Sequence, residues 1–376
     1  MKTNYRFSRS QLIGLCSVIL LSPALRLYPA GSAGIAGRAA WLSAPAAIPL
    51  LLVYIYFICR FMDARQENEG LGELSLRCLG DKAGKAVLLA FSAWLLLYSG
   101  FVLRSGADRL ITTIYPYSTP HIFTVVMGLV CLFGALGPVR SIVRVAKLVL
   151  PIVLGTLILI LIFAMLGINP SNLLPITVYD FVPVIKGTLP IIDVILVVIY
   201  TICFVVGLTP KKEKSFRDYS VWMILMSILL MFLSITVIGS FGAELTTRLT
   251  RPFFSLVRNL VFFHTLERVE ALVVALWILP DFLLVSLLLA SAQHCLRIVM
   301  GSKNTFYQGE RLFDMKNGRW IIPVCAGISI LCGLFIAPDP LSLELWSERL
   351  IPLINFIVAL LLIPFIYIVG KARKKL

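Results

Sequence analysis

Long apolar runs separated by short polar connections dominate the pattern of this chain. A helix that crosses the hydrocarbon core of a bilayer needs about 20 mostly apolar residues. Ten stretches come close to or exceed this length, and turn-forming or charged residues separate them. They cover residues 10–36, 40–60, 84–110, 120–137, 140–167, 182–208, 217–243, 266–299, 319–337 and 350–370. The pattern therefore predicts an all-α integral membrane protein with ten transmembrane helices.

The first of these spans contains residues that interrupt helices. Residues 20–37 read LLSPALRLYPAGSAGIAG. Pro23 and Pro29 each remove a backbone donor, and three glycines weaken the helix that follows. Broken backbone exposed to lipid would leave polar groups unsatisfied, at a cost of several kcal/mol each. We therefore expect the first helix to break near mid-membrane, where the broken backbone faces protein or a cavity.

The sixth span has the same character, because Pro183, Gly187 and Pro190 stand near its start. Two interrupted spans at corresponding positions of two halves point to the binding site of a transporter-type fold. The pattern thus predicts two repeats of five helices each, over residues 10–167 and 182–370.

Composition supports a membrane protein and changes the meaning of the charge. The chain is 59% hydrophobic and 14% charged, which favours a single membrane domain over residues 1–376 rather than a soluble domain with a large core. The formal net charge of +15 would suggest nucleic acid in a soluble protein. Here the basic residues lie in the short connections between apolar runs, which is the signature of membrane topology. We expect no nucleic-acid partner.

The basic residues favour one orientation. Both termini and every even-numbered connection are basic, whereas residues 169–180 contain no lysine or arginine. The positive-inside rule therefore predicts cytoplasmic termini. One exception is TTRLTRPFFSLVRNLVFF at 246–263, which carries Arg248, Arg251 and Arg258. We expect this segment to lie on the outer surface, with its arginines towards head groups and its phenylalanines inward.

Charges inside the spans are costly in lipid and usually mark function or pairing. Snorkelling to the interface is the preferred interpretation of Arg104. The alternative is a pair with Asp108, which is four residues away on the same helix face. Asp281 is expected to face the bundle interior, either in a functional cavity or as a hydrogen-bonded structural carboxylate. Arg26 and Asp193 are predicted to meet across a cavity. The alternative leaves Arg26 free for a ligand carboxylate and Asp193 for an amine.

Catalytic and metal-binding signals are missing from the sequence. It contains no Gly-rich phosphate loop, no H-E-x-x-H and no G-x-S-x-G motif. The three histidines are scattered near span ends, and the cysteines lack the paired spacing of a metal or redox site. We therefore predict neither an enzyme nor a bound cofactor or metal.

Three stretches carry a resemblance to a known family. They are PAGSAGIAGRAAWLS at 29–43, KGTLP at 186–190 and ERVEALVVALWILPDFLLVS at 267–286. Together with the ten spans, they resemble the membrane-embedded B subunits of bacterial spore germinant receptors. This endospore germination permease family belongs to the amino acid, polyamine and organocation transporter superfamily. The resemblance implies a leucine-transporter-like fold of two inverted five-helix repeats.

The same resemblance implies a site, partners and a location. A small nutrient, such as an amino acid or a related molecule, would bind between broken helices one and six and helices three and eight. The candidate ligand-binding residues are Ser22, Pro23, Ala24, Arg26, Tyr98, Asp193, Val194, Ile195, Trp277 and Asp281. Packing explains Tyr98 and Trp277 better than a ligand contact does. The implied partners are a larger membrane subunit and a lipoprotein subunit in the inner spore membrane.

Two alternatives to a germinant receptor stay open. One is a secondary amino acid transporter driven by H⁺ or Na⁺. The other is a structural receptor subunit whose pocket has decayed. The second rests on departures from the family pattern, such as Ala39 at the position where the family commonly has an aspartate.

Overall fold

The computed structural model describes residues 7–66, 69–209, 215–260, 269–301 and 320–375, and within these ranges the chain is helical without strands. Each of the ten predicted spans is a helix or a run of helices. They are α1 (Arg9–Ala36), α2 (Ser43–Asp63), α4 (Asp81–Thr113), α5 (Pro120–Leu136), α6 (Val139–Met165), α7 (Phe181–Lys186) with α8 (Leu189–Val205), α9 (Ser215–Phe241), α12 (Val269–Val299), α13 (Ile321–Phe335), and a last span of α14 (Pro340–Leu345), α15 (Ile351–Phe356) and α16 (Ile363–Ala372).

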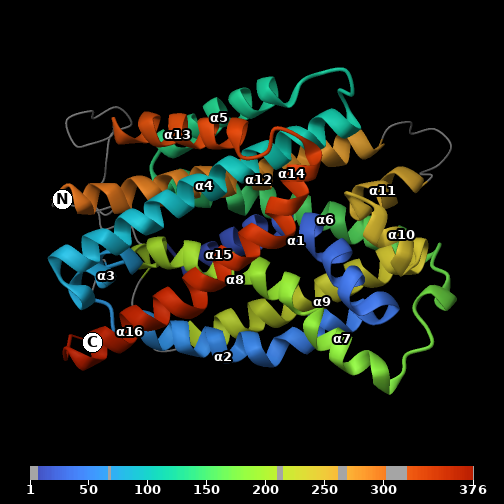
Figure 1. The fold of residues 1–376 in the computed structure, drawn as a ribbon, viewed down its shortest axis with the longest axis horizontal. Helices are drawn as coiled ribbons and strands as arrows, with labels where there is room; N and C mark the ends of the chain where they lie inside the picture. Colours follow the sequence, from blue (N-terminus) through green and yellow to red (C-terminus); the bar gives the residue numbers. More distant parts are fainter. Residues whose placement is uncertain (1–6, 67–68, 210–214, 261–268, 302–319, 376) are drawn as a thin grey trace.

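The last span is not uniformly α-helical. Two π-helical segments, Trp346–Leu350 and Ile357–Leu362, flank α15 on either side. Both chain termini lie at one end of the bundle, as Figure 1 shows. The opposite end, which we call the far end, carries α7 and the short helices α10 (Ala243–Arg248) and α11 (Pro252–Asn259). The short helix α3 (Leu71–Leu79) lies at the end of the termini.

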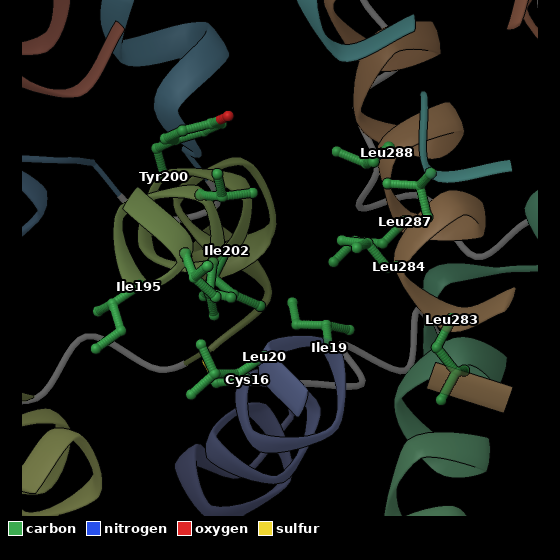
Figure 2. Packing of buried hydrophobic residues seen from close by; sticks show 14 of the residues in the cluster. Cys16, Ile19, Leu20, Ile195, Tyr200, Ile202, Leu283, Leu284, Leu287 and Leu288 are labelled. Carbon is green, nitrogen blue, oxygen red and sulfur yellow. The ribbon is translucent and has the colours of Figure 1, made fainter. Parts of the chain in front are cut away.

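The first helix does not break where its prolines predict. It is continuous from Arg9 to Ala36, with Pro23 and Pro29 inside it. Each proline removes one backbone hydrogen bond, but tight packing holds the helix together around the gap. Figure 2 shows apolar side chains of α1 packed between those of α8 and α12. The chain leaves the helix only at Gly37, whose φ of 58° is readily adopted by glycine.

The sixth span does break, at Gly187 and Thr188 between α7 and α8. The turn is packed closely, because a Cβ at Gly187 would lie 2.5 Å from the Ser43 hydroxyl oxygen. Side chains from the neighbouring spans satisfy carbonyls of this turn. The Ser32 hydroxyl donates to Gly187 at 2.8 Å, and the Ser43 hydroxyl donates to Val184 at 3.1 Å. The break therefore faces protein, as the sequence predicts.

Helices α4, α5, α12 and α13 pack on one another as a four-helix layer. One side of this layer is covered by α1, α2, α8 and α9 (Figure 1). Helix α1 contacts both α8 and α12, so it joins the two groups of helices. Within the four-helix layer, α4 and α13 touch through their backbones. A Cβ at Gly100 would lie 2.6 Å from the Ser329 carbonyl oxygen and 2.8 Å from the Gly333 nitrogen. Such contacts between small residues are typical of membrane helix pairs.

The segment after α9 is amphipathic, but its charges are not all turned outward. Phe253 and Phe254 of α11 are buried as predicted, with ring centroids 5.5 and 6.4 Å from that of Trp277. Arg248 and Arg258 are exposed. Arg251 instead points inward and pairs with Asp108 of α4, so its predicted place among head groups is wrong.

Several predictions lie outside the described residues. These are the basic positions Lys211, Lys212 and Lys214, the basic residues between 302 and 319, the end of the amphipathic segment at 261–263, and the start of span eight with Glu267 and Arg268.

Candidate functional site

A cavity of about 500 Å³ lies towards the far end of the bundle. Its walls come from α1, from the middle of α4, from the start of α8, from the α10–α11 connection and from the last span. These elements belong to both layers of the fold. The volume falls within the range of roughly 300–1,000 Å³ that is usual for small-molecule sites.

Arg26 of α1 lines this cavity and forms no ion pair with any described residue. Its guanidinium carbon lies 4.7 Å from the ring centroid of Phe101, which is a cation–π contact. The Nε and Nη2 atoms are buried, and none of the described residues accepts a hydrogen bond from them. Burying a charge is unfavourable unless the charge is paired. Arg26 is therefore suited to an anionic group of a ligand.

Asp193 of α8 lines the same cavity with 1% of its surface exposed. Its Oδ1 accepts a hydrogen bond of 2.7 Å from the side-chain amide of Asn355 on α15. Among the described residues, no ion pair or hydrogen bond joins Asp193 to Arg26. The predicted pair is thus not formed, because Arg26 stacks on Phe101 and Asp193 is held by Asn355. The two charges nevertheless share one cavity.

Asp281 of α12 faces the bundle interior as predicted, with 1% of its surface exposed. It forms an ion pair with Arg109 of α4 and accepts a hydrogen bond from the Ser22 hydroxyl of α1. The Arg109 guanidinium also lies 5.5 Å from the ring centroid of Phe254. Asp281 does not line the cavity. Its position favours the structural reading, in which one carboxylate joins α1, α4 and α12.

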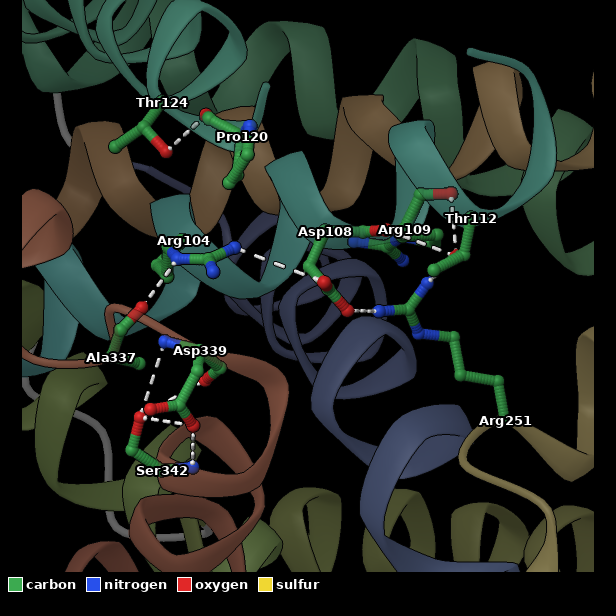
Figure 3. A network of polar contacts seen from close by, with 10 residues as sticks. All are labelled: Arg104, Asp108, Arg109, Thr112, Pro120, Thr124, Arg251, Ala337, Asp339 and Ser342. Carbon is green, nitrogen blue, oxygen red and sulfur yellow. Dashed lines mark hydrogen bonds and ion pairs between the residues drawn. The ribbon is translucent and has the colours of Figure 1, made fainter. Parts of the chain in front are cut away.

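A second charged network, shown in Figure 3, holds the far end of α4. Arg104 is buried and pairs with Asp108 at 3.8 Å, so the pairing is confirmed and the snorkelling interpretation is wrong. Arg104 also donates to the Ala337 carbonyl at 2.8 Å. Arg251 pairs with Asp108 from the other side and donates to Thr112. The network therefore ties α4 to the chain before α11 and to the chain before α14.

Asp339 caps the start of α14 beside this network. The backbone N–H of Ser342 donates to its Oδ1 at 2.7 Å, and this hydrogen bond lowers the pKa of Asp339 below its usual value. The cap fixes the first turn of the last span, which forms part of the cavity wall.

Seven charges meet in this part of the bundle, and five of them are paired. Those charges are Arg26, Arg104, Asp108, Arg109, Asp193, Arg251 and Asp281. Arg104 and Arg251 share Asp108, and Arg109 pairs with Asp281. Arg26 and Asp193 form no ion pair within 4 Å with any described residue. Both line the cavity, together with the exposed carboxylates of Glu344 and Glu348, so the buried wall offers a positive and a negative charge to a ligand.

The other predicted ligand residues do not form the wall of the cavity. They are Ser22, Pro23, Ala24, Tyr98, Val194, Ile195, Trp277 and Asp281. Tyr98 stacks between Trp94 and Phe101 with centroid distances of 5.9 and 6.2 Å, and Trp277 packs on α11. These contacts favour packing for both aromatic residues. A ligand contact at any of the eight stays a prediction.

Several residues of the site were not predicted from the sequence. The cavity is also lined by Phe101, Ser105, Glu344 and Glu348. Asn355 does not line it but donates a hydrogen bond to Asp193, which does. Asn355 carries a visible signal, since it is an uncharged polar residue inside the apolar run of the last span. The described residues contain no group of three or more histidines, cysteines or carboxylates that could hold a metal ion.

Comparisons with known proteins agree with this architecture. A family model described as "Spore germination protein" matches residues 6–336. No curated protein matches the chain. Mhp1, a nucleobase-cation-symport-1 family transporter in a closed conformation with bromovinylhydantoin bound, superposes with a TM-score of 0.61 at 13% identity over 89% of this chain and 74% of its own. A Na⁺-coupled sialic acid symporter in a substrate-bound outward-open state gives 0.58 at 12% identity over 98% and 80%. At these identities the likeness shows the fold.

Proposed function

Because this chain belongs to the spore germination protein family, we propose that it is the membrane subunit of a nutrient receptor of the spore. It binds a small nutrient, such as an amino acid or a related molecule, and this binding signals the spore to germinate. The observation that carries this proposal is the cavity lined by the buried charges of Arg26 and Asp193, neither of which forms an ion pair with a described residue. Opposite charges on one cavity wall suit a ligand that itself carries both signs.

The mechanism uses side chains rather than free backbone groups. The first helix is continuous, so it offers no broken helix end to the ligand. Arg26 holds the ligand carboxylate through charge-assisted hydrogen bonds, and Asp193 holds its ammonium group. Arg26 and Asp193 stand on α1 and α8, whereas Phe101 and Ser105 stand on α4 of the four-helix layer. A ligand between them biases the arrangement of the two layers, which partner subunits read out.

The receptor assembly is part of the proposal. The partners are a larger membrane subunit with soluble domains and a lipoprotein subunit, in the inner spore membrane, and the complex performs no catalytic reaction. Secondary amino acid transport is the second candidate function. It is favoured by the fold that the chain shares with two transporters.

Germination and uptake assays separate these functions. We expect spores that lack the gene to stop responding to at least one L-amino acid of a panel, measured as the fall in optical density. Complementation with the wild-type gene is expected to restore the response. The purified chain in proteoliposomes is expected not to accumulate that amino acid. Accumulation driven by an H⁺ or Na⁺ gradient would establish the transporter instead, and an unchanged germination response to the whole panel would reject the receptor.

We also propose that the termini face the cytoplasm and the cavity faces outward. Lys82, at the end of the termini, and Ser171, at the far end, are both exposed. In a cysteine-free background, a cysteine at position 171 is expected to react with an impermeant maleimide added to intact cells. A cysteine at position 82 is expected to react only after permeabilisation. The reverse labelling pattern would invert the orientation.

A further inference from the structure

The amide of Asn355 stands in a chain of buried hydrogen bonds that ends at the cavity. The Trp94 indole N–H donates to the Tyr200 hydroxyl at 2.9 Å. That hydroxyl donates to Asn355 Oδ1 at 2.8 Å, and Asn355 Nδ2 donates to Asp193 at 2.7 Å. All four side chains are buried. The chain therefore links α4, α8 and the last span to one cavity carboxylate.

The two ends of this chain fix its direction together. A tryptophan indole can only donate and a carboxylate can only accept, so the Asn355 NH₂ group points to Asp193. The Asn355 carbonyl oxygen then faces Tyr200, whose hydroxyl donates to it while accepting from Trp94. Asp193 is thus held as a hydrogen-bond acceptor at Oδ1. The Asn355 bond is the one hydrogen bond that Asp193 accepts from the described side chains, and the cation nearest to it on the cavity wall is Arg26.

The backbone around Asn355 supports a functional role. The six-residue helix α15 that carries it lies between two π-helical segments, and such segments occur frequently at functional sites. At the mouth of the cavity, Glu344 and Glu348 add two exposed carboxylates four residues apart. The last span therefore contributes two exposed carboxylates to the cavity, and through Asn355 it orients the carboxylate of Asp193 on the cavity wall.

We propose that Asn355 is a positioning residue that holds Asp193 as an acceptor facing the cavity, so that the site selects ligands carrying an ammonium group. The ammonium part rests on the proposed nutrient-binding function. The positioning part rests on the hydrogen-bond chain alone. Asn355 itself does not line the cavity; it acts through Asp193.

Exchanging the two side chains tests the positioning part without any ligand. Asn355→Asp removes the donor and sets a second carboxylate against Asp193, so the Tm of the purified full chain is expected to fall by roughly 5 °C or more. Asp193→Asn keeps an acceptor for Asn355, and its Tm is expected within about 2 °C of the wild type. The exchange Asp193→Asn with Asn355→Asp restores every hydrogen bond and is expected to recover the Tm. An Asn355→Asp variant as stable as the wild type, or an exchange variant no more stable than Asn355→Asp, overturns the proposal.

Binding measurements test the selection of an ammonium group. The probes are L-amino acids, each compared with the α-hydroxy acid that has the same side chain. The wild type is expected to bind at least one amino acid at least about tenfold more tightly than its hydroxy acid. Asp193→Asn and the exchange variant are expected to lose this preference, because the charge is absent from the cavity wall in both.

A third variant examines the fixed direction of the hydrogen-bond chain. Tyr200→Phe removes the hydrogen bond to Asn355 Oδ1 and leaves the amide held by Asp193 alone, so we expect a smaller preference for the amino acid in a protein that still folds. An unchanged preference in Tyr200→Phe and in the exchange variant overturns the selection by Asn355. If the wild type binds no probe, the nutrient-binding function fails together with the ammonium part. The Tm pattern still decides the positioning role in that case.

Discussion

Replacing Asp281 with leucine is expected to lower the free energy of unfolding by roughly 3–5 kcal/mol, the largest stability effect that the structure predicts. The substitution leaves the Arg109 guanidinium buried without a counter-ion, and the Ser22 hydroxyl loses its acceptor. Arg109→Leu is expected to cost a similar amount, because it leaves Asp281 unpaired. The double variant is expected to unfold close to the wild type, since replacing both partners of a buried pair with apolar residues is often nearly neutral.

An exposed ion pair provides the control for this experiment. Arg248 and Glu244 pair at 2.6 Å, and their side chains are 73% and 82% exposed. Exposed pairs contribute about 0–1 kcal/mol, so Glu244→Leu is expected to change stability little. Unfolding is followed by tryptophan fluorescence in mixed micelles. A double variant as unstable as Asp281→Leu would show that lost packing, rather than an uncompensated charge, causes the effect.

Replacing Arg26 with leucine is expected to have the opposite profile, with a large loss of ligand binding and no loss of stability. Arg26 has no hydrogen-bond or ion-pair partner among the described residues, so its removal breaks only the cation–π contact with Phe101, and it also removes a buried charge whose desolvation is unfavourable. A hydrogen bond to a charged group contributes about 1.5–3 kcal/mol. Binding of the recognised amino acid is therefore expected to weaken roughly tenfold to a hundredfold in calorimetric titration. The Tm is expected to stay at the wild-type value or to rise.

Two further variants make the Arg26 result specific. Arg258→Gln removes an exposed arginine of α11 that does not line the cavity, and binding is expected to stay unchanged. The double variant Arg26→Leu with Asp193→Leu is expected to bind more weakly than either single variant. If the double variant instead recovered stability that each single variant had lost, Arg26 and Asp193 would act as a pair in solution, and the proposed ligand contacts would be wrong.

The positions of the spans could be predicted because the bilayer imposes both length and apolarity. The fifth span, predicted at 140–167, is α6 from Val139 to Met165. The predicted break in the first helix was wrong. A proline inside a helix costs about 3 kcal/mol and acts locally, whereas α1 is enclosed by other helices along most of its length. Packing of this kind depends on distant segments. The proline pattern alone therefore could not distinguish a kinkable helix from a broken one.

The candidate site was predictable only in part, for a similar reason. Arg26 and Asp193 stood out because charges are rare in apolar spans. Their actual neighbours come from elsewhere in the chain. Asn355 is 162 residues from Asp193, and Arg251 is 143 residues from Asp108. No periodicity or spacing encodes such contacts, so the pairing of Arg251 and the support of Asp193 appear only in the folded chain.

The glycine contact between α4 and α13 gives the cavity one stiff wall. At Gly100 and Gly333 the two backbones meet without a side chain between them, so no rotamer change can absorb a displacement there. Gly100 is followed on α4 by Phe101 and Ser105, which line the cavity. Because they stand on the same part of α4, they are held rigidly as well. The wall formed by α4 thus serves as a fixed reference frame. A change in cavity width must therefore arise from displacement of α1, α8 or the last span relative to α4. For a ligand that bridges Arg26 and Asp193, the length of the ligand sets the size of that displacement.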